Sequence, residues 1–427
     1  MKPISVRRLL GRAAGGGGII VFFIAAFEVM IMISPFAFFF YSVFNPIFKF
    51  LDQYAATRWL TGFFLPHMVL PPTLPLQIIR VLGSVFFIVG ALTFIVCALQ
   101  IYVGKIFRWG AANKGLYAFI RHPQYLALGI WGLGMTILWP RFIVLTTLSV
   151  MFILYFFLAK DEERRMLARH GDSYSQYMKK TGMFFPLFLE KWLSRLGLLI
   201  PAKAPRYAAI SAVIVVLVVG AGFVCRAATL GSIPFQSNHN ITLFSILPED
   251  NASNAAAAEY IVTGHAAGKL PLLRDDADYV GYLMPADYIM QGMIADTGGE
   301  FHLFKQHNTV AMITDWVLNP FEHLRTSPSI HMAKMHNVDP AVARRHHCPL
   351  GINKPDLDCK TCPYRRVIIL EVHHTDGGHL SGSDLMSLQN TRVPVYAVDI
   401  DIRTGEIVNV IKVGRATAWE DVPTPDI

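Results

Sequence analysis

Five long apolar segments in the first half of the chain constrain its fold more than any other feature. They lie at about 19–44, 77–104, 124–139, 142–159 and 207–224. A helix that crosses a bilayer needs about 20 apolar residues, so the first, second and fifth segments each predict a membrane span. The third and fourth are shorter and meet at Trp139-Pro140-Arg141. Because proline breaks a helix interior, these two segments predict a helical hairpin that turns at Pro140.

The composition supports a membrane protein and divides the chain into two halves. Only 16% of the 427 residues are charged and 53% are hydrophobic, which excludes a disordered chain and a wholly soluble one. Residues 1–226 carry 23 Lys/Arg against 7 Asp/Glu, whereas residues 227–427 carry 15 against 23. A basic half suggests nucleic acid or membrane as the partner. Here the basic residues flank apolar segments, so we expect a lipid bilayer and no nucleic acid.

The positions of the basic residues also predict the orientation. Four Lys/Arg precede the first span, four lie in residues 104–123 and ten in residues 160–206, but only two lie in residues 45–76. Loops rich in Lys and Arg stay in the cytoplasm. We therefore expect a cytoplasmic N-terminus and a fifth span that exports the rest of the chain. The expected location is a bacterial inner membrane, with the C-terminal domain periplasmic or extracellular.

Together these features predict the fold class. We expect an α-helical polytopic membrane domain with about five transmembrane segments, including the helical hairpin, followed by an exported α+β soluble domain. The expected divisions are a membrane domain at 1–206, the fifth transmembrane helix at 207–226, a linker region at 227–275 and the exported domain at 276–427. The linker region predicts a short helix near 255–263. Strands are expected at 367–372, 393–402 and 407–413, with a turn at 403–406 between the last two.

Polar residues gather at the open end of the predicted hairpin. Its first arm begins with Arg121-His122-Pro123-Gln124-Tyr125, preceded by Tyr117, and its second arm ends in Glu162-Glu163. Since the two arms of a hairpin meet at its open end, we expect the arginine and histidine to lie near the two glutamates at the membrane surface. Pro123 at the first helical position leaves nearby backbone N–H groups free to face a ligand.

Such a cluster suits S-adenosylmethionine, which carries a carboxylate, an ammonium and a sulfonium. Arg121, His122 and the helix N-terminus suit its carboxylate. One of the two glutamates suits its ammonium or its ribose hydroxyls. Tyr117 and Tyr125 can stack on its adenine or face its sulfonium. Charged residues at the ends of spans are also common topology anchors, so a plain ion pair between an arginine and a glutamate remains the alternative at this point.

The stretch around these residues resembles the isoprenylcysteine carboxyl methyltransferase and phospholipid N-methyltransferase family. The similarity lies in G-x-Y, then R-H-P-x-Y, a helical hairpin, E-E, and G-x-x-Y-x-x-Y with a closing proline, over residues 100–190 or so. Members of that family are integral membrane enzymes that use S-adenosylmethionine. The resemblance implies that the cofactor-contacting positions are Tyr117, His122, Pro123, Gln124, Tyr125 and Glu162, with Glu163 as the second acidic residue and Arg121 in support.

Three positions depart from the family pattern. Ala127 stands where glycine is usual, and Trp139-Pro140 forms the turn where Asn-Pro is common. Leu158 occupies the position, four residues before the matched glutamate, at which the prenylcysteine branch has a substrate-contacting arginine. The last departure argues against prenylcysteine as the methyl acceptor. We therefore expect an S-adenosylmethionine-dependent membrane methyltransferase that acts at the cytoplasmic face on a lipid or another amphiphilic small molecule.

The second half of the chain is rich in histidine and cysteine. Ten of the 15 histidines fall in residues 302–379. Thiolate and imidazole suit zinc, copper or iron, and the candidate metal ligands are His347, Cys348, Cys359 and Cys362. In an exported domain the same cysteines can instead form a disulfide or a redox pair. The alternative function is therefore a non-catalytic membrane anchor that carries an exported metal-binding or redox domain.

Overall fold

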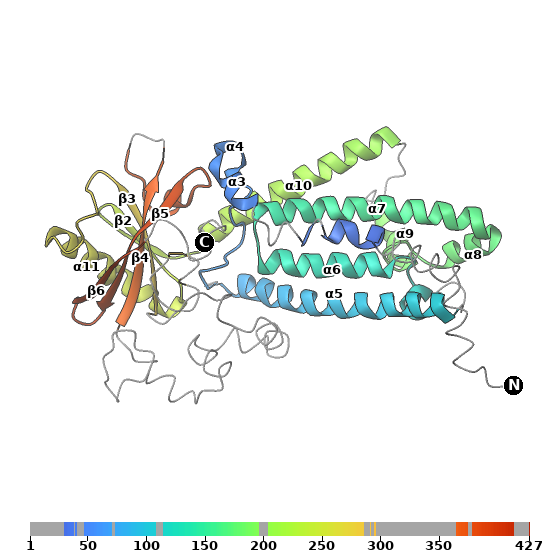
Figure 1. The fold of residues 1–427 in the computed structure, drawn as a ribbon, viewed down its shortest axis with the longest axis horizontal. Coiled ribbons are helices and arrows are strands. Elements are labelled where there is room, and N and C mark those ends of the chain that lie inside the picture. Colours follow the sequence, from blue (N-terminus) through green and yellow to red (C-terminus); the bar gives the residue numbers. More distant parts are fainter. Residues whose placement is uncertain are drawn as a thin grey trace, which may run out of the picture. The chain divides into compact units, whose positions relative to one another are not determined.

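The computed structural model contains two compact units (Figure 1). The described residues are 30–37, 39–40, 47–70, 73–107, 114–195, 204–285, 291, 294–295, 364–374, 378–413 and 427. The helical unit comprises Met1–Phe44, Val89–Leu133 and Thr146–Val216, and the sheet unit comprises Asn45–Ile88, Gly134–Leu145 and Leu217–Ile427. Among the described elements, the helices that contribute residues to both units are α5 (Leu74–Phe107), α6 (Pro123–Leu138), α7 (Phe142–His170) and α10 (Ala204–Leu230).

Three of the described helices are long and apolar enough to cross a membrane. These candidate spans are Leu74–Gly104 in α5, Phe142–His170 in α7 and Tyr207–Leu230 in α10. In α10 only 6% of the most apolar stretch is buried inside the protein, so its valine and leucine side chains form an exposed surface. Lipid tails suit such a surface, since exposed apolar side chains are unfavourable in water. Most of the predicted first span at 19–44 lies outside the described residues. Within this segment, the described residues 30–37 are helical.

The predicted helical hairpin is confirmed. Helix α6 ends before Pro140 and helix α7 begins after it. Helix α6 has 16 residues and is shorter than any of the candidate spans. In the sheet unit, the loop around Gly62 provides hydrogen-bond acceptors for the start of α7. The backbone N–H of Phe142 donates to Gly62 O, and that of Ile143 donates to Leu60 O. These bonds satisfy N–H groups that the first turn of a helix leaves without partners.

Helices α5 and α6 approach each other closely at Gly90 in the helical unit. A Cβ atom added to Gly90 would lie 2.3 Å from the backbone nitrogen of Trp131 on α6. Only glycine permits such an approach of two backbones, because it has no side chain. The Trp131 ring also packs on Phe36, with 4.7 Å between the ring centroids. The glycine therefore allows α5 to lie directly against the helix that starts at the predicted polar cluster.

The sheet unit contains a mixed sheet whose spatial order follows the chain order. Its strands are β1 (Phe235–Asn238), β2 (Ile241–Ser245), β3 (Asp278–Pro285), β4 (Tyr364–His373), β5 (Thr391–Asp401) and β6 (Ile407–Lys412). Strands β2 and β3 are parallel, and all other neighbours are antiparallel. Parallel neighbours need a long crossover connection, which helix α11 (Asn254–Ala266) provides.

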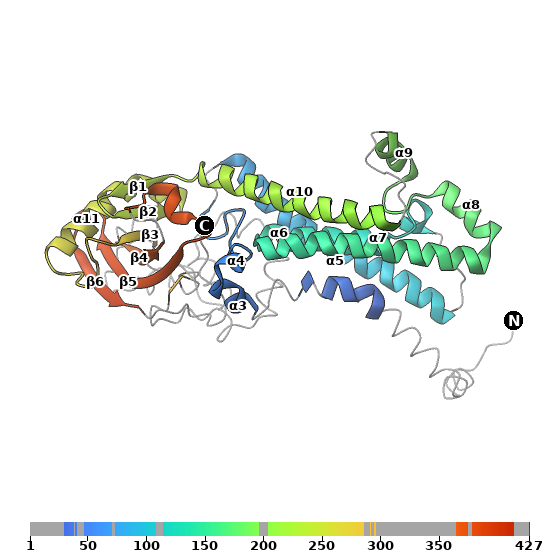
Figure 2. The ribbon, with the colours of Figure 1, turned by 90° about the horizontal axis from the view of Figure 1, so that it is seen from above.

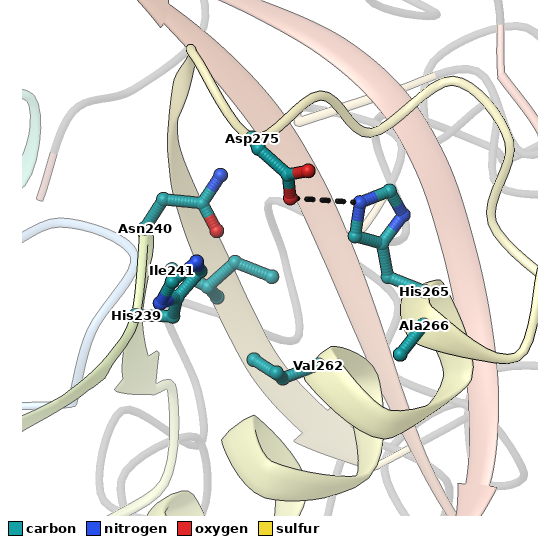
Figure 3. A pocket seen from close by; sticks show the side chains of 7 residues that line it. All are labelled: His239, Asn240, Ile241, Val262, His265, Ala266 and Asp275. Atoms are coloured by element: carbon teal, nitrogen blue, oxygen red, sulfur yellow. Dashed lines mark ion pairs between the residues drawn. The ribbon is translucent and has the colours of Figure 1, made fainter.

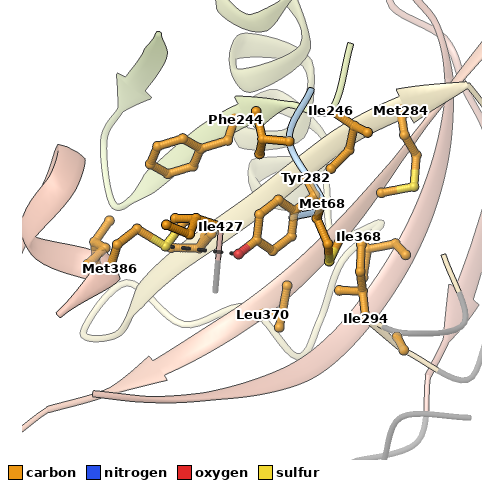
Figure 4. Close-up of a cluster of buried hydrophobic side chains, with 14 of the residues drawn as sticks. Met68, Phe244, Ile246, Tyr282, Met284, Ile294, Ile368, Leu370, Met386 and Ile427 are labelled. Carbon is orange, nitrogen blue, oxygen red and sulfur yellow. Dashed lines mark hydrogen bonds between the residues drawn. The ribbon is translucent and has the colours of Figure 1, made fainter. Parts of the chain in front are cut away.

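Both faces of this sheet are buried. On β3, Tyr279 and Leu283 belong to the core that α11 covers, whereas Val280 and Tyr282 belong to the core on the opposite face. This alternation follows from the two-residue period of a strand. Figure 4 shows the second core, which also contains Met68 from the loop before α5. Burial on both faces accounts for the nearly continuous apolar runs in β3 and β4.

The C-terminal strands and the short helix predicted from the sequence are confirmed in the sheet unit. The expected turn at 403–406 joins β5 to β6, and Gly405 in this turn has a φ of 74°, which favours glycine. Residues 227–275, expected as a linker region with this short helix, also contain the strands β1 and β2. The sequence of β1, Phe-Gln-Ser-Asn, has no apolar alternation, so it reads as a loop although it pairs with β2.

Candidate cofactor site

The open end of the hairpin carries a compact cluster of charged side chains in the helical unit. Helix α6 begins at Pro123, so Arg121 and His122 lie just before its first turn. Glu162 and Glu163 lie on α7, about two turns before the end of that helix. The short 3-10 helix Gly115–Ala118 leads the chain into the cluster. The two arms of the hairpin therefore meet at its open end, as predicted.

Glu163 is the buried acceptor of this cluster. Arg121 Nε donates a hydrogen bond to Glu163 Oε1 at 2.5 Å, and His122 Nε2 lies 3.5 Å from the same oxygen. The side chains of Arg121 and Glu163 are only 9% and 11% exposed. Charge-assisted hydrogen bonds of this kind are short and strong. The pair therefore fixes the arginine and one carboxylate inside the helical unit.

Glu162 is the open acceptor of the cluster. The Tyr125 hydroxyl donates to Glu162 Oε1 at 2.7 Å, and His122 Nδ1 lies 3.4 Å from Glu162 Oε2. The Glu162 side chain is 42% exposed, far more than that of Glu163. An ionised carboxylate has about four acceptor sites, so protein contacts leave some of them available. Glu162 is thus oriented by the protein and still open to the hydrogen-bond donors of a ligand.

His122 lies between the two carboxylates, and its side chain is 6% exposed. Burial alone would lower the pKa of His122, but the hydrogen bonds and charges of Glu162 and Glu163 outweigh burial and raise this pKa above its usual value. Its Nε2 atom is buried and, among the described residues, has no hydrogen-bond partner of good geometry. Its contact at this nitrogen is the 3.5 Å ion pair with Glu163, so the two carboxylates hold the imidazole between them.

Stacked rings extend from the cluster into the helical unit. His122 stacks on Tyr125 with 5.6 Å between centroids, and Tyr125 stacks on Tyr155 of α7 with 4.7 Å between centroids. Tyr155 is buried and precedes Glu162 by seven residues, which is about two turns of one helix face. Tyr155 was not predicted as a site residue, although its spacing of seven residues from Glu162 indicates that both lie on one face of α7.

The segment that follows α8 (Asp172–Lys180) closes one side of the cluster. The backbone N–H groups of Arg121 and His122 donate to Gly182 O at 2.8 Å and to Met183 O at 3.1 Å. The Arg121 guanidinium also donates to the Thr181 carbonyl. These bonds hold the backbone at 121–122 so that both side chains face the glutamates. These hydrogen bonds could not be predicted from the sequence, because they depend on the path of the chain after α7 and α8.

The other predicted cofactor residues are buried. Tyr117 accepts a hydrogen bond at its carbonyl from the Tyr177 hydroxyl at 2.6 Å, and its own hydroxyl lies 3.5 Å from the Cys97 carbonyl. Burial raises the pKa of Tyr117 above its usual value, so its hydroxyl stays neutral. Pro123 and Gln124 are buried in the first turn of α6. Glu162, by contrast, lies at the open edge of the cluster.

A separate pocket of about 370 Å³ lies in the sheet unit, beside α11 and the turn between β1 and β2 (Figure 3). Its lining residues are His239, Asn240, Ile241, Val262, His265, Ala266 and Asp275. His265 Nδ1 lies 3.1 Å from the Leu270 carbonyl, and its Nε2 lies 3.4 Å from Asp275. Asp275 is 84% exposed, and an ion pair so open to water is weak. The buried cluster of the helical unit is therefore the better candidate site.

The candidate metal ligands of the second half lie outside the described residues: His347, Cys348, Cys359 and Cys362. Where the structure does describe the chain, no three His, Cys, Asp or Glu side chains form a group that could hold a metal ion. Two histidines of the histidine-rich region contact a buried carboxylate instead. His374 Nε2 and His379 Nδ1 lie 3.0 and 2.7 Å from the Asp278 carboxylate oxygens.

Comparison with known proteins identifies relatives of the segment that contains the cluster. Residues 82–168 match the isoprenylcysteine carboxyl methyltransferase (ICMT) family, which confirms the resemblance for this segment. Over 78 residues the chain is 38% identical to the protein-S-isoprenylcysteine O-methyltransferase of Schizosaccharomyces pombe. The aligned stretch covers 18% of this chain and 32% of that protein. The chain thus spans about a third of the length of this curated relative. No solved structure matches the chain.

Proposed function

We propose that the helical unit is an S-adenosylmethionine-dependent methyltransferase. The observation that supports this most is the half-exposed Glu162 beside the buried His122, within the segment that matches a methyltransferase family. When bound, S-adenosylmethionine supplies a methyl group on a sulfonium, which passes to a nucleophile by in-line displacement. Such a reaction depends mainly on alignment and on the exclusion of water, so it needs few acid–base residues.

The charges of the cluster fit the zwitterionic end of this cofactor. Glu162 offers open carboxylate oxygens to an ammonium or to hydroxyl donors, and Arg121 and His122 offer positive charge to a carboxylate. Tyr125 holds Glu162 in position through its hydroxyl, and its ring stacks on those of His122 and Tyr155. We therefore assign cofactor binding to these residues, with Glu163 in a positioning role.

For the methyl acceptor we propose a lipid amine or another amphiphile that enters from the bilayer. Leu158 lies one turn from Glu162 on α7, and the neighbouring Leu154 and Phe157 are 40% and 39% exposed. An apolar surface beside the cluster suits an acceptor that is partly dissolved in lipid. Leu158 offers no charge to a carboxylate acceptor. Mass spectrometry of lipids from membranes with and without the protein would identify the methylated product.

We propose that the cluster faces the cytoplasm. If each apolar segment crosses the membrane once, the N-terminal tail and residues 104–123 and 160–206 lie on the same side. These three stretches carry 18 of the 23 basic residues in residues 1–226. Basic segments of this kind stay in the cytoplasm. In the same crossing pattern, the chain after α10 lies on the opposite side of the membrane. The charge pattern thus supports a cytoplasmic methyltransferase site with an exported sheet unit.

Binding of radiolabelled S-adenosylmethionine to the purified full chain in nanodiscs tests the function. Glu162→Gln keeps the size of the side chain and removes its charge, and we expect binding to weaken by roughly tenfold or more, since a hydrogen bond to a charged group contributes about 1.5–3 kcal/mol. Asp161→Asn is the matched control, because Asp161 pairs with Arg164 and Arg165 on the surface of α7.

Two outcomes contradict the proposal in different ways. If the wild-type chain shows no binding of S-adenosylmethionine, the proposed cofactor is wrong. If the wild type binds and Glu162→Gln binds equally well, the assignment of the site is wrong. Folding of each variant is checked by its melting temperature in the same nanodiscs.

A further inference from the structure

The helix that follows the cluster exposes its apolar side chains. Helix α9 (Leu187–Arg195) and the residues before it carry one exposed stripe: Phe185, Phe188, Lys191, Trp192 and Arg195. These positions recur at intervals of three and four residues, so they share one face of the helix. Phe188 is 75% exposed and Trp192 is 55% exposed. A helix surrounded by water turns its aromatic side chains toward the protein, so this face requires another environment.

Away from the exposed stripe, α9 is bound to the protein through Glu190. Glu190 Oε1 accepts hydrogen bonds from the backbone N–H groups of Met183, Phe184 and Phe185 at 2.6, 2.9 and 3.2 Å. The acidic side chain of α9 therefore points inward, whereas the basic Lys191 lies on the exposed face.

We propose that α9 is an interfacial anchor that inserts Phe188 and Trp192 into an anionic phospholipid surface. Aromatic side chains favour the headgroup boundary of a bilayer, and basic side chains attract anionic headgroups. Lys179 and Lys180 at the end of α8 are exposed and add positive charge next to α9. Figure 2 shows α9 projecting away from α7 and α8.

The anchor is connected to the candidate site by backbone contacts. Glu190 holds residues 183–185, and Met183 in turn accepts the hydrogen bond from the His122 backbone N–H. The Phe184 ring lies 6.0 Å from the His122 ring. Insertion of α9 into lipid therefore fixes the segment that closes one side of the cluster. This consequence for the cofactor site rests on the proposed function, whereas the anchor itself does not.

Photo-crosslinking of the full chain in nanodiscs tests the anchor. Photoreactive benzoylphenylalanine replaces Trp192 or, as a matched control, Phe235, an aromatic residue of β1 that is 42% exposed. In nanodiscs that contain phosphatidylglycerol, we expect several-fold more lipid adducts by mass spectrometry at position 192 than at position 235. Equal adduct yields at the two positions would overturn the proposal. Crosslinks from position 192 to protein in place of lipid would also overturn it, because another part of the protein would then cover α9.

The charge of the anchor is tested with the same readout. The double variant Lys191→Glu, Arg195→Glu is expected to lower the adduct yield several-fold in nanodiscs with phosphatidylglycerol, and the control Lys269→Glu in the sheet unit is expected to leave it unchanged. An equal yield in phosphatidylcholine alone, or in the double variant, would overturn the assignment of an anionic surface. Neither readout involves the cofactor, so a failure to bind S-adenosylmethionine would refute the proposed function and leave the anchor standing.

Discussion

His122 is buried between Glu162 and Glu163, whose oxygens lie 3.4 and 3.5 Å from its two ring nitrogens. A buried charge is unfavourable unless it is paired, and here the imidazolium has two carboxylates as partners. Arg121 compensates the second carboxylate from the other side, at 2.5 Å from Glu163. The cluster therefore carries two positive and two negative charges when His122 is protonated.

We predict that His122 stabilises the folded protein most at low pH. Its pKa in the folded protein is raised above the ordinary value of 6.5, so the folded state binds the proton more tightly than the unfolded chain. The resulting stability is fully present below about pH 6.5 and is lost as the pH rises through the folded-state pKa. The melting temperature of the wild type, measured relative to that of His122→Asn, should therefore fall as the pH increases above about 6.5.

The control for this series is His170→Asn, which replaces an exposed histidine at the end of α7. It should leave the melting temperature close to that of the wild type, because this side chain lies on the surface. A difference between wild type and His122→Asn that stays constant from mildly acidic to alkaline pH would show that His122 does not bind its proton more tightly in the folded state.

At the scale of elements, the contact between α5 and α6 provides a test of helix packing. We predict that Gly90→Ala destabilises the helical unit, because the new Cβ atom would lie 2.3 Å from the backbone of Trp131 and the helices must move apart. Overpacking of this kind costs about 1–3 kcal/mol. The measurement is thermal unfolding of the full chain in detergent, followed by circular dichroism.

Gly104→Ala on the same helix is the matched control for Gly90→Ala. Among the described residues beyond its own helix and chain neighbours, none has an atom within 4 Å of a Cβ atom built at Gly104, and alanine favours a helix over glycine by about 1 kcal/mol. We therefore expect Gly104→Ala to leave the melting temperature unchanged or to raise it. Equal effects of the two substitutions would show that helix propensity, and not the close approach, determines the result.

The strands β4 and β5 share a buried ion pair whose removal should destabilise the sheet unit. Arg366 Nε and Nη2 donate to the two Asp399 oxygens, both at 2.8 Å, and the side chains are 5% and 0% exposed. Arg366→Met leaves the Asp399 charge buried without its partner, at an expected cost of about 3–5 kcal/mol in urea unfolding. The double variant with Asp399→Leu should recover much of that loss.

The matched control is Arg403→Met on the turn after β5. Arg403 pairs with Asp401 at 3.1 Å, but its side chain is 65% exposed, so the loss should be within about 1 kcal/mol. If Arg366→Met were no more costly than Arg403→Met, the buried pair would not contribute to the stability of the sheet.

Elements that depend on local chemistry were predictable from the sequence, and those that depend on distant pairing were not. Pro140 predicted the turn between α6 and α7, and Gly405 lies in the turn expected between β5 and β6. The short β1 has no strand signal in its own sequence. It is held in the sheet by its pairing with β2 and by the burial of the neighbouring strands.

The same distinction applies to the candidate site. The hairpin geometry predicted that Arg121 and His122 meet the two glutamates, because sequence position alone places both pairs at the open end. The backbone acceptors at Gly182 and Met183 were not predictable, since they follow two further helices and a reversal of the chain. The cofactor itself stays a prediction that the binding experiments address.

At the scale of the whole chain, the long apolar helices and the sheet differ in the surface that they expose. In the helical unit, α5 exposes Leu92 and Val96 by 59% and 60%, as a lipid-facing helix does. In the sheet unit, both faces of the central strands are buried, as in a domain that folds in water. The sign of the net charge changes along the chain in the same way. One chain thus contains one part suited to lipid and one suited to water.

The orientation of the chain gives the last prediction. Lys179 of α8 and Lys269 after α11 are both exposed, and the candidate span in α10 lies between them in the chain. If α10 crosses the membrane as proposed, the two lysines lie on opposite sides of it. In sealed vesicles a membrane-impermeant maleimide should label Lys179→Cys from the cytoplasmic side alone and Lys269→Cys from the other side alone. The parent chain measures labelling of the native cysteines, and detergent should make both positions reactive. Labelling of both variants from one side would rule out export by α10 and would place the cluster and the sheet unit in the same compartment.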